Sequence, residues 1–318
     1  MSRCRIVSCL KTFFVFVLAD QQHHRNINMR SASVLCPLLA LCLCVTVSGM
    51  RLQSRLTPRV IGGTEVVDRC KSPYNAMVAL QFTSPTGPVT FCSAVMLTDT
   101  ILVTSAYCVY QFLALKDIPI KAIVGERDMF MTDRDEQVID IDSVKVHRMY
   151  NDSTLDNNVG LVRLVTPARL SDCVQPAVKM EADPAACNDV DKTCVMVGWG
   201  PYAENSKPTN SRLPRYANIT VLGNFLTNML SYQLLRRGPP TGTLLAEPSN
   251  PNTKACFFDW GGLVSCQRNG KSVLRGVIGE HNCNTEVGQT PPILVSDIPT
   301  YQPWIDSCIS SWNSCLTL

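Results

Sequence analysis

The chain has 318 residues, of which 46 % are hydrophobic and 17 % are charged, a composition typical of a globular protein. Its formal charge of +3 is misleading, because the excess of Lys and Arg lies before residue 60. Residues 60–318 hold 21 basic and 25 acidic residues, and this mildly acidic balance argues against nucleic acid as a partner.

Two apolar runs lie near the N-terminus, at residues 6–19 and 34–47. Neither reaches the roughly 20 residues of a membrane-spanning helix, so no membrane span is expected. The second run ends in small residues of the kind that precede signal-peptide cleavage. We therefore expect residues 1–49 to be a leader for secretion, with Met29 as a candidate working start, and residues 50–59 to be a short pro-segment. A buried core helix is the alternative interpretation of these runs.

Short apolar runs recur after residue 60, separated by Gly, Pro, Asn and Asp. Many short strands with turn signals between them predict an all-β barrel or sandwich. The segment "YQPWIDSCISSWNSC" (301–315) has Trp and Ile near helical spacing and predicts one terminal amphipathic helix. The expected strands are residues 76–82, 93–98, 100–106, 120–126, 138–146, 158–165, 193–200, 216–222, 261–266, 272–280 and 292–298.

Six motifs follow one another along most of this region: "RVIGGTEV" (59–66), "FCSAVMLTDTILVTSAYC" (91–108), "DNNVGLVRL" (156–164), "CVMVGWG" (194–200), "ACFFDWGGLVSC" (255–266) and "YQPWI" (301–305). They resemble, in that order, the activation site, the catalytic-histidine stretch, the catalytic-aspartate segment, the Gly-Trp-Gly landmark, the nucleophile loop and the terminal helix of trypsin-like serine proteases. The resemblance implies that residues 60–318 form two six-stranded antiparallel Greek-key barrels packed face to face. A C-terminal helix would complete the fold, with the site between the barrels.

The resemblance also assigns three catalytic positions, and none of them carries the catalytic group. Tyr107 stands in the histidine position, and a phenol that titrates near 10 is a poor base at neutral pH. Asn158 stands in the aspartate position without its charge, and Trp260 in the serine position has no nucleophilic oxygen. We therefore expect no catalysis, with a weak or altered hydrolase as the alternative.

Positions that support the chemistry in the family are altered too. Phe258 matches the glycine that helps to bind the oxyanion, and Lys254 matches the acidic floor of a trypsin-type specificity pocket. The pocket wall would fall at residues 279–281. The histidines after residue 60, His147 and His281, have no metal-like spacing with Cys, Asp or Glu, so neither a metal nor another cofactor is expected.

The activation machinery of the family, by contrast, is matched. Arg59 precedes Val60, and Asp259 precedes Trp260. By resemblance, cleavage after Arg59 would free the amino group of Val60 to pair with Asp259, and burying both charges together offsets the cost of burying either alone. Such a pairing would order the site without catalysis and act as a switch. The alternative is a relic motif in which other donors satisfy Asp259.

The cysteines fit an oxidising compartment. The resemblance implies the disulfides Cys92–Cys108, Cys194–Cys266 and Cys256–Cys283. Ser231 stands where the family has a further cysteine, and residues 195–255 contain no cysteine that could be its mate. Eleven cysteines follow residue 60, an odd number that indicates a free thiol or a disulfide-linked oligomer. Those left without an assigned partner are Cys70, Cys173, Cys187, Cys308 and Cys315.

Two further features concern the surface. Asn151 and Asn218 begin glycosylation sequons, and we expect at least one to be used in a secreted protein. Residues 232–255 are longer than the corresponding family segment and predict a surface loop that carries binding, with a tolerated insertion as the alternative.

The function that these features indicate is binding outside the cell. The protein would act as a cofactor, decoy or scaffold for a protein partner, namely an active protease, its substrate or a receptor. A structural component of an extracellular fluid or matrix, joined through an odd cysteine, is the remaining interpretation.

Overall fold

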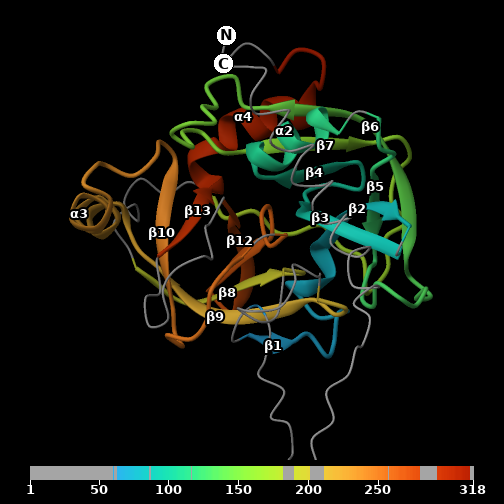
Figure 1. Ribbon diagram of the computed structural model, residues 1–318, viewed down its shortest axis with the longest axis horizontal. Coiled ribbons are helices and arrows are strands. Elements are labelled where there is room, and N and C mark those ends of the chain that lie inside the picture. The colour runs from blue at the N-terminus through green and yellow to red at the C-terminus, as the bar shows by residue number, and fades with distance from the viewer. Residues whose placement is uncertain are drawn as a thin grey trace, which may run out of the picture. The chain divides into compact units, whose positions relative to one another are not determined.

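Strands dominate the computed structural model (Figure 1), which describes residues 60, 63–85, 87–115, 117–181, 190–200, 211–256, 258–279 and 292–315. The expected leader and pro-segment, residues 1–49 and 50–59, therefore lie outside the described residues. Within the described ranges, no helix combines the length and the apolar character needed to cross a membrane.

The first barrel is closed by six antiparallel strands in the order β2-β3-β4-β7-β6-β5. Its interior is apolar because the inward positions of neighbouring strands meet in register. Val78 pairs with Ala94 on one side and with Val124 on the other, and all three are almost completely buried. The strands are β2 (Met77–Ser84), β3 (Gly87–Met96), β4 (Ile101–Thr104), β5 (Lys121–Val124), β6 (Gln137–Val146) and β7 (Gly160–Leu164).

The second barrel follows the order β9-β10-β13-β12-β11-β8 and closes where β8 pairs with β9. Strand β9 alternates buried and more exposed residues, the pattern of a strand with one face on a core. The short β1 (Thr64–Glu65) adds to β9. The barrel strands are β8 (Asp191–Gly198), β9 (Arg215–Val221), β10 (Thr243–Pro248), β11 (Leu263–Arg268), β12 (Lys271–Ile278) and β13 (Ile293–Asp297).

One apolar cluster joins the two barrels. It contains Met77 and Leu161 from the first barrel, Leu263 and Val277 from the second, and Trp304 from the terminal helix. The barrels are therefore packed on each other with the terminal helix against them, as the resemblance implies (Figure 1).

Helices lie outside the barrels, together with one short 3-10 turn. Helix α2 begins after β4, and the Ser105 hydroxyl caps it by accepting a hydrogen bond from the Cys108 N–H at 3.2 Å. The predicted terminal helix is present and begins three residues earlier than expected, at Ile298. The elements are η1 (Tyr74–Ala76), α2 (Ala106–Ala114), α3 (Asn224–Leu235) and α4 (Ile298–Ser310).

The prediction of a loop over residues 232–255 is wrong. The segment starts in the last turn of α3 and contains β10, which pairs with β9 and β13 inside the second barrel. The residues between the two elements, 236–242, form the real connection. Ser231, which the resemblance places in a cysteine position, is completely buried on α3.

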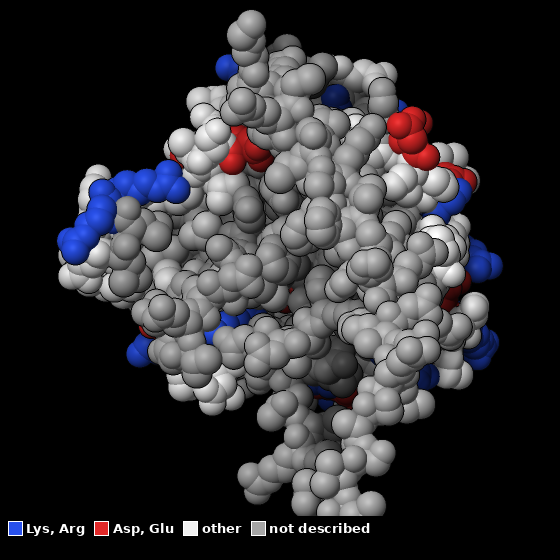
Figure 2. All heavy atoms as spheres, in the orientation of Figure 1, with Lys and Arg blue, Asp and Glu red and all other residues white. Residues whose placement is uncertain are grey.

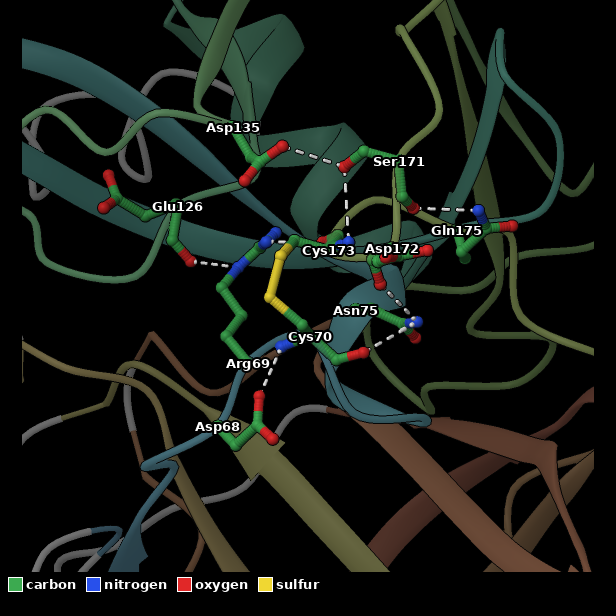
Figure 3. Close-up of a disulfide and its surroundings, with 10 residues drawn as sticks. All are labelled: Asp68, Arg69, Cys70, Asn75, Glu126, Asp135, Ser171, Asp172, Cys173 and Gln175. Atoms are coloured by element: carbon green, nitrogen blue, oxygen red, sulfur yellow. Dashed lines mark hydrogen bonds between the residues drawn. A yellow bond between two sulfur atoms is a disulfide. The ribbon is translucent and has the colours of Figure 1, made fainter.

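Disulfides link distant parts of the chain. The structure contains Cys92–Cys108 and Cys194–Cys266, and it adds Cys70–Cys173 and Cys308–Cys315, which the sequence left open. Cys256 is also disulfide-bonded, but its expected partner Cys283 lies outside the described residues, as does Cys187. Figure 3 shows how the Cys70–Cys173 bridge ties the segment before η1 to the segment after β7.

Candidate functional site

Two of the three positions that resemble the catalytic triad are joined by a hydrogen bond. Tyr107 lies in the first turn of α2, and Asn158 lies just before β7. The backbone N–H of Tyr107 donates to Oδ1 of Asn158 at 3.0 Å, and Asn158 is 2 % exposed. The backbone carbonyl of Asn158 accepts a 2.5 Å hydrogen bond from the Ser296 hydroxyl of β13. The amide side chain therefore holds the start of α2, a structural use of this position.

Trp260 completes the group. It lies in the turn before β11, yet its indole packs with the apolar core of the first barrel rather than the second. The rings of Trp260 and Tyr107 meet edge to face, with centroids 4.6 Å apart and planes at 80°. Trp260 is only 8 % exposed. We call Tyr107, Asn158 and Trp260 together the aromatic plug. They occupy the positions that the resemblance assigns to the base, the orienting group and the nucleophile.

The turn that carries Trp260 is fixed by β3. The backbone N–H of Ser93 donates to the Trp260 carbonyl at 2.8 Å, and the Ser93 hydroxyl donates to the Phe258 carbonyl at 3.4 Å. Phe258 has a φ of 73°, a conformation that glycine adopts without strain and that costs other residues about 1–2 kcal/mol. The turn thus keeps a glycine-like backbone at the position where the resemblance expects glycine. Sequence reasoning missed Ser93, because nothing in its apolar strand marks its role.

Asp259 lies in this turn, between Phe258 and Trp260, and is completely buried. Its Oδ1 accepts a hydrogen bond from the Gly200 N–H at 2.8 Å, and its Oδ2 accepts one from the Cys256 N–H at 2.9 Å. Burial raises the pKa of Asp259 to about 7, and the two backbone donors oppose that rise. A Cβ added at Gly198 would lie 2.1 Å from Oδ1, so this position has no room for a side chain.

The proposed activation pair is described only in part. Val60 is 1 % exposed and packs with the core of the second barrel, whereas Arg59 lies outside the described residues. Two backbone N–H groups already donate to Asp259. This fits the alternative interpretation, in which the activation motif is a relic and other donors satisfy the carboxylate. The role of Asp259 as acceptor for a freed amino group stays a prediction.

The pocket positions are likewise described in part. Lys254 is 5 % exposed and follows the buried Thr253. The N–H of Gly279 donates to the Leu294 carbonyl at 2.8 Å, which fixes the end of β12 beside β13. Glu280 and His281 lie outside the described residues.

Of the two histidines after residue 60, the structure describes His147. His147 lies between Tyr301 and Trp304, at ring-centroid distances of 5.5 and 5.1 Å, and burial lowers its pKa. Such a position suits a packed imidazole more than a proton carrier. Among the described residues, no group of three or more His, Cys, Asp or Glu side chains could hold a metal ion. The sequon residues Asn151 and Asn218 are both exposed, as glycan attachment requires.

The comparison with protein-family models shows which family this chain belongs to. The family model described as Trypsin matches residues 60–305. The chain belongs to the trypsin family. Its β-barrels and terminal helix are the fold that this membership implies.

The chain is similar to trypsin-family proteins over most of its length. "Chymotrypsin-like elastase family member 1" of Felis catus is 24 % identical over 258 residues, covering 80 % of this chain and 90 % of that protein. "Trypsin-3" of Salmo salar is 27 % identical over 223 residues, covering 70 % and 84 %. "Chymotrypsin-C" of Rattus norvegicus is 22 % identical over 292 residues, covering 88 % and 99 %.

Proposed function

We propose that this trypsin-family protein is a secreted, non-catalytic homologue that works by binding a protein partner. The observation that carries the proposal is the aromatic plug. A serine protease needs a hydroxyl, an imidazole and a carboxylate in mutual contact. Here an indole, a phenol and an amide occupy the matched positions, with the Trp260 and Tyr107 rings 4.6 Å apart. Disulfides on both barrels support an oxidising, extracellular setting.

The test of inactivity compares the purified protein with an active trypsin. Peptide and ester substrates, together with a covalent serine-hydrolase probe, cover acyl transfer to any activated serine. We expect no turnover and no labelling. Turnover that disappears in Ser105→Ala or Ser93→Ala, or a labelled serine found by mass spectrometry, would favour the altered hydrolase and end this proposal. Both serines lie close to the aromatic plug.

Helix α3 and the connection behind it are the surface that we assign to the partner. Phe225, Met229 and Tyr232, spaced four and three residues apart, are 67, 41 and 62 % exposed on one face of the helix. Exposed apolar side chains gathered in this way mark interaction surfaces. Figure 2 shows Lys and Arg gathered over the same end of the molecule (left), where Arg236 and Arg237 follow α3. A partner with an apolar patch flanked by carboxylates fits this surface.

The partner is to be captured from the fluid in which the protein occurs and identified by mass spectrometry. Binding of the identified partner is then measured with Met229→Ser/Tyr232→Ser and with Arg236→Ser/Arg237→Ser. Lys271→Ser, an exposed basic residue on β12, is the matched control. We expect both double variants to weaken binding at least about tenfold. Unchanged affinity in both double variants would show that the partner binds another surface.

Cleavage after Arg59 is the switch that we propose for this binding. N-terminal sequencing of the native protein shows whether the mature chain starts at Val60. Partner affinity is then compared before and after cleavage by trypsin, in the wild type and in Asp259→Asn. A partner affinity that rises on cleavage in the wild type but not in Asp259→Asn would support the switch. Equal affinity before and after cleavage in both proteins would show that binding does not depend on cleavage. Migration on a non-reducing gel tests the structural alternative, because a disulfide-linked oligomer separates on reduction.

A further inference from the structure

Helix α3 is held only weakly on the second barrel. It lies at the edge of that barrel, beside β10 (Figure 1). Among residues 224–233, Thr227 and Ser231 alone are buried, and no described residue of α3 belongs to an apolar core cluster. Packing of an apolar face supplies most of the stability of a helix in a folded protein, and α3 lacks that contribution.

The two halves of α3 differ in how they are attached. In the first half, the Thr227 hydroxyl donates to the Leu222 carbonyl at 3.3 Å and accepts from the Leu245 N–H of β10 at 3.1 Å. One turn later, the buried hydroxyl of Ser231 has no hydrogen-bond partner among the described residues. A buried polar group without a partner regains hydrogen bonds to water when the chain opens. Serine also cannot form the disulfide that the trypsin-like resemblance expects at this position, so nothing covalent opposes the opening.

The C-terminal end of α3 is unfavourable as well. Arg236 ends the helix with a φ of 57°, in the left-handed region that glycine or asparagine usually occupies at this place. Helices α2 and α4 each end with a backbone N–H that donates to a carbonyl of the last turn, and α3 has no such bond among the described residues. Local unfolding is therefore expected to begin at this end of α3.

The chain is fixed again at Thr241. Its N–H donates to Oδ1 of Asp156 at 2.6 Å, and its carbonyl accepts from the Tyr301 hydroxyl at 3.0 Å. The bonds of Thr227 and Thr241 thus enclose a segment that can open while the barrel strands on either side stay in place.

Two exposed arginines, Arg236 and Arg237, lie inside this segment. Exposure alone does not make a good cleavage site, because a protease must draw several residues into its own cleft. Arg148 is exposed too, but it lies in a turn that is closed by a 2.9 Å hydrogen bond from the Tyr150 N–H to the His147 carbonyl. Proteolysis concentrates where the chain is both exposed and easily opened, and the pair after α3 meets both conditions.

We propose that the peptide bond between Arg237 and Gly238 is a site of limited proteolysis by an arginine-specific protease. Water adds to the carbonyl carbon of Arg237 and the C–N bond breaks. Arg237 gains a carboxylate, and the amino group of Gly238 leaves with a proton from the water. The Cys194–Cys266 disulfide spans the cut, so the product is one molecule of two linked chains. The cut requires neither a partner nor catalysis by this chain, and it is independent of the function proposed above.

Trypsin, added in catalytic amount to the purified full-length protein, tests the proposal. We expect one species on a non-reducing gel and two chains after reduction, with N-terminal sequencing of the shorter chain starting at Gly238. Cleavage after Arg59 is told apart because its product starts at Val60. Mass spectrometry of the protein from its native fluid should detect the same terminus at Gly238.

Three variants make the test specific. Arg236→Gln/Arg237→Gln should abolish the fragment that starts at Gly238, and both side chains are exposed, so the fold should tolerate the change. Arg148→Gln removes one exposed arginine from a fixed turn and is the matched control, with an unchanged rate of cleavage. Ser231→Ala removes the unpaired hydroxyl and favours the helix, so we expect cleavage to be about threefold slower.

Four outcomes would overturn the proposal. They are a first cut at another arginine of the region after residue 60, an unchanged rate in Arg236→Gln/Arg237→Gln, a rate in Ser231→Ala that equals or exceeds that of the wild type, and the absence of the Gly238 terminus from the native protein. Separation of the two chains without reduction would overturn the disulfide-linked form of the product.

Discussion

Replacing Trp260 by serine, the residue that the trypsin-like resemblance expects at this position, should destabilise the protein strongly. A tryptophan side chain buries roughly 200 Å², and at about 25 cal/mol per Å² this corresponds to roughly 5 kcal/mol. Trp260 is 8 % exposed, so it buries nearly all of that area. Because the unfolded chain already hides part of its apolar surface, we expect Trp260→Ser to cost about 3–5 kcal/mol.

Urea unfolding followed by circular dichroism measures this loss. With a slope of about 2–3 kcal/mol per molar urea, the midpoint should fall by about 1–2 M while the slope is preserved. Phe225→Ser is the control, because Phe225 is 67 % exposed and should change stability by no more than about 0.5 kcal/mol.

A double-mutant cycle isolates the ring contact within this total. Tyr107→Ala and Trp260→Ala, made singly and together, should be coupled by about 0.5–1.5 kcal/mol, the usual value for an edge-to-face aromatic pair. If Trp260→Ser lowered the free energy of unfolding by less than about 1 kcal/mol, the reasoning would be refuted, because removing a ring that fills the core costs more than that. A coupling near zero would show that the two rings contribute separately.

Three further predictions concern chemistry, pH and cross-linking. The triple variant Tyr107→His/Asn158→Asp/Trp260→Ser should show no hydrolysis of peptide or ester substrates, because Phe258 and Lys254 still disturb the site, and robust turnover by the folded variant would contradict this. Stability should fall as pH rises from about 4 to 7, because Asp259 and Glu126, whose pKa values are raised to about 7, keep protons in the folded protein that the unfolded chain releases. Urea midpoints at pH 5 and 8 should therefore differ less in Asp259→Asn than in the wild type, and an equal difference would reject Asp259 as a source. Replacing both Cys70 and Cys173 by serine should cost about 2–5 kcal/mol, and an unchanged melting temperature would show that the bridge is dispensable.

Much of the fold was predictable because the barrels consist of short strands with clear local signals. The runs at 138–146 and 216–222 became β6 and β9 almost residue for residue. Strand β10 was missed because "TLLAEP" stands among Gly, Pro and Asn and ends in proline. Only its pairing with β9 and β13 makes this segment a strand, and such tertiary pairing has no local signature.

The candidate site was predictable to a different extent. The resemblance placed Tyr107, Asn158 and Trp260 on three separate segments, and the structure brings them into one group. It could not indicate that the Asn158 side chain accepts from a backbone N–H, or that Ser93 fixes the turn before β11. The Cys70–Cys173 bridge joins residues 103 apart, a separation from which no partner can be inferred.

The position of the Trp260 indole has a consequence for how the protein can change over time. An enzyme must leave its cleft open to substrate and so forgoes the stability that filling it would give. In this chain a ring carried by the second barrel is packed into the core of the first. For a non-catalytic homologue of the kind proposed above, inherited substitutions at Trp260 and Tyr107 would be selected by the yield of folded protein rather than by turnover. Variation there should follow side-chain volume, with Phe or Leu tolerated before any residue that restores a reactive group.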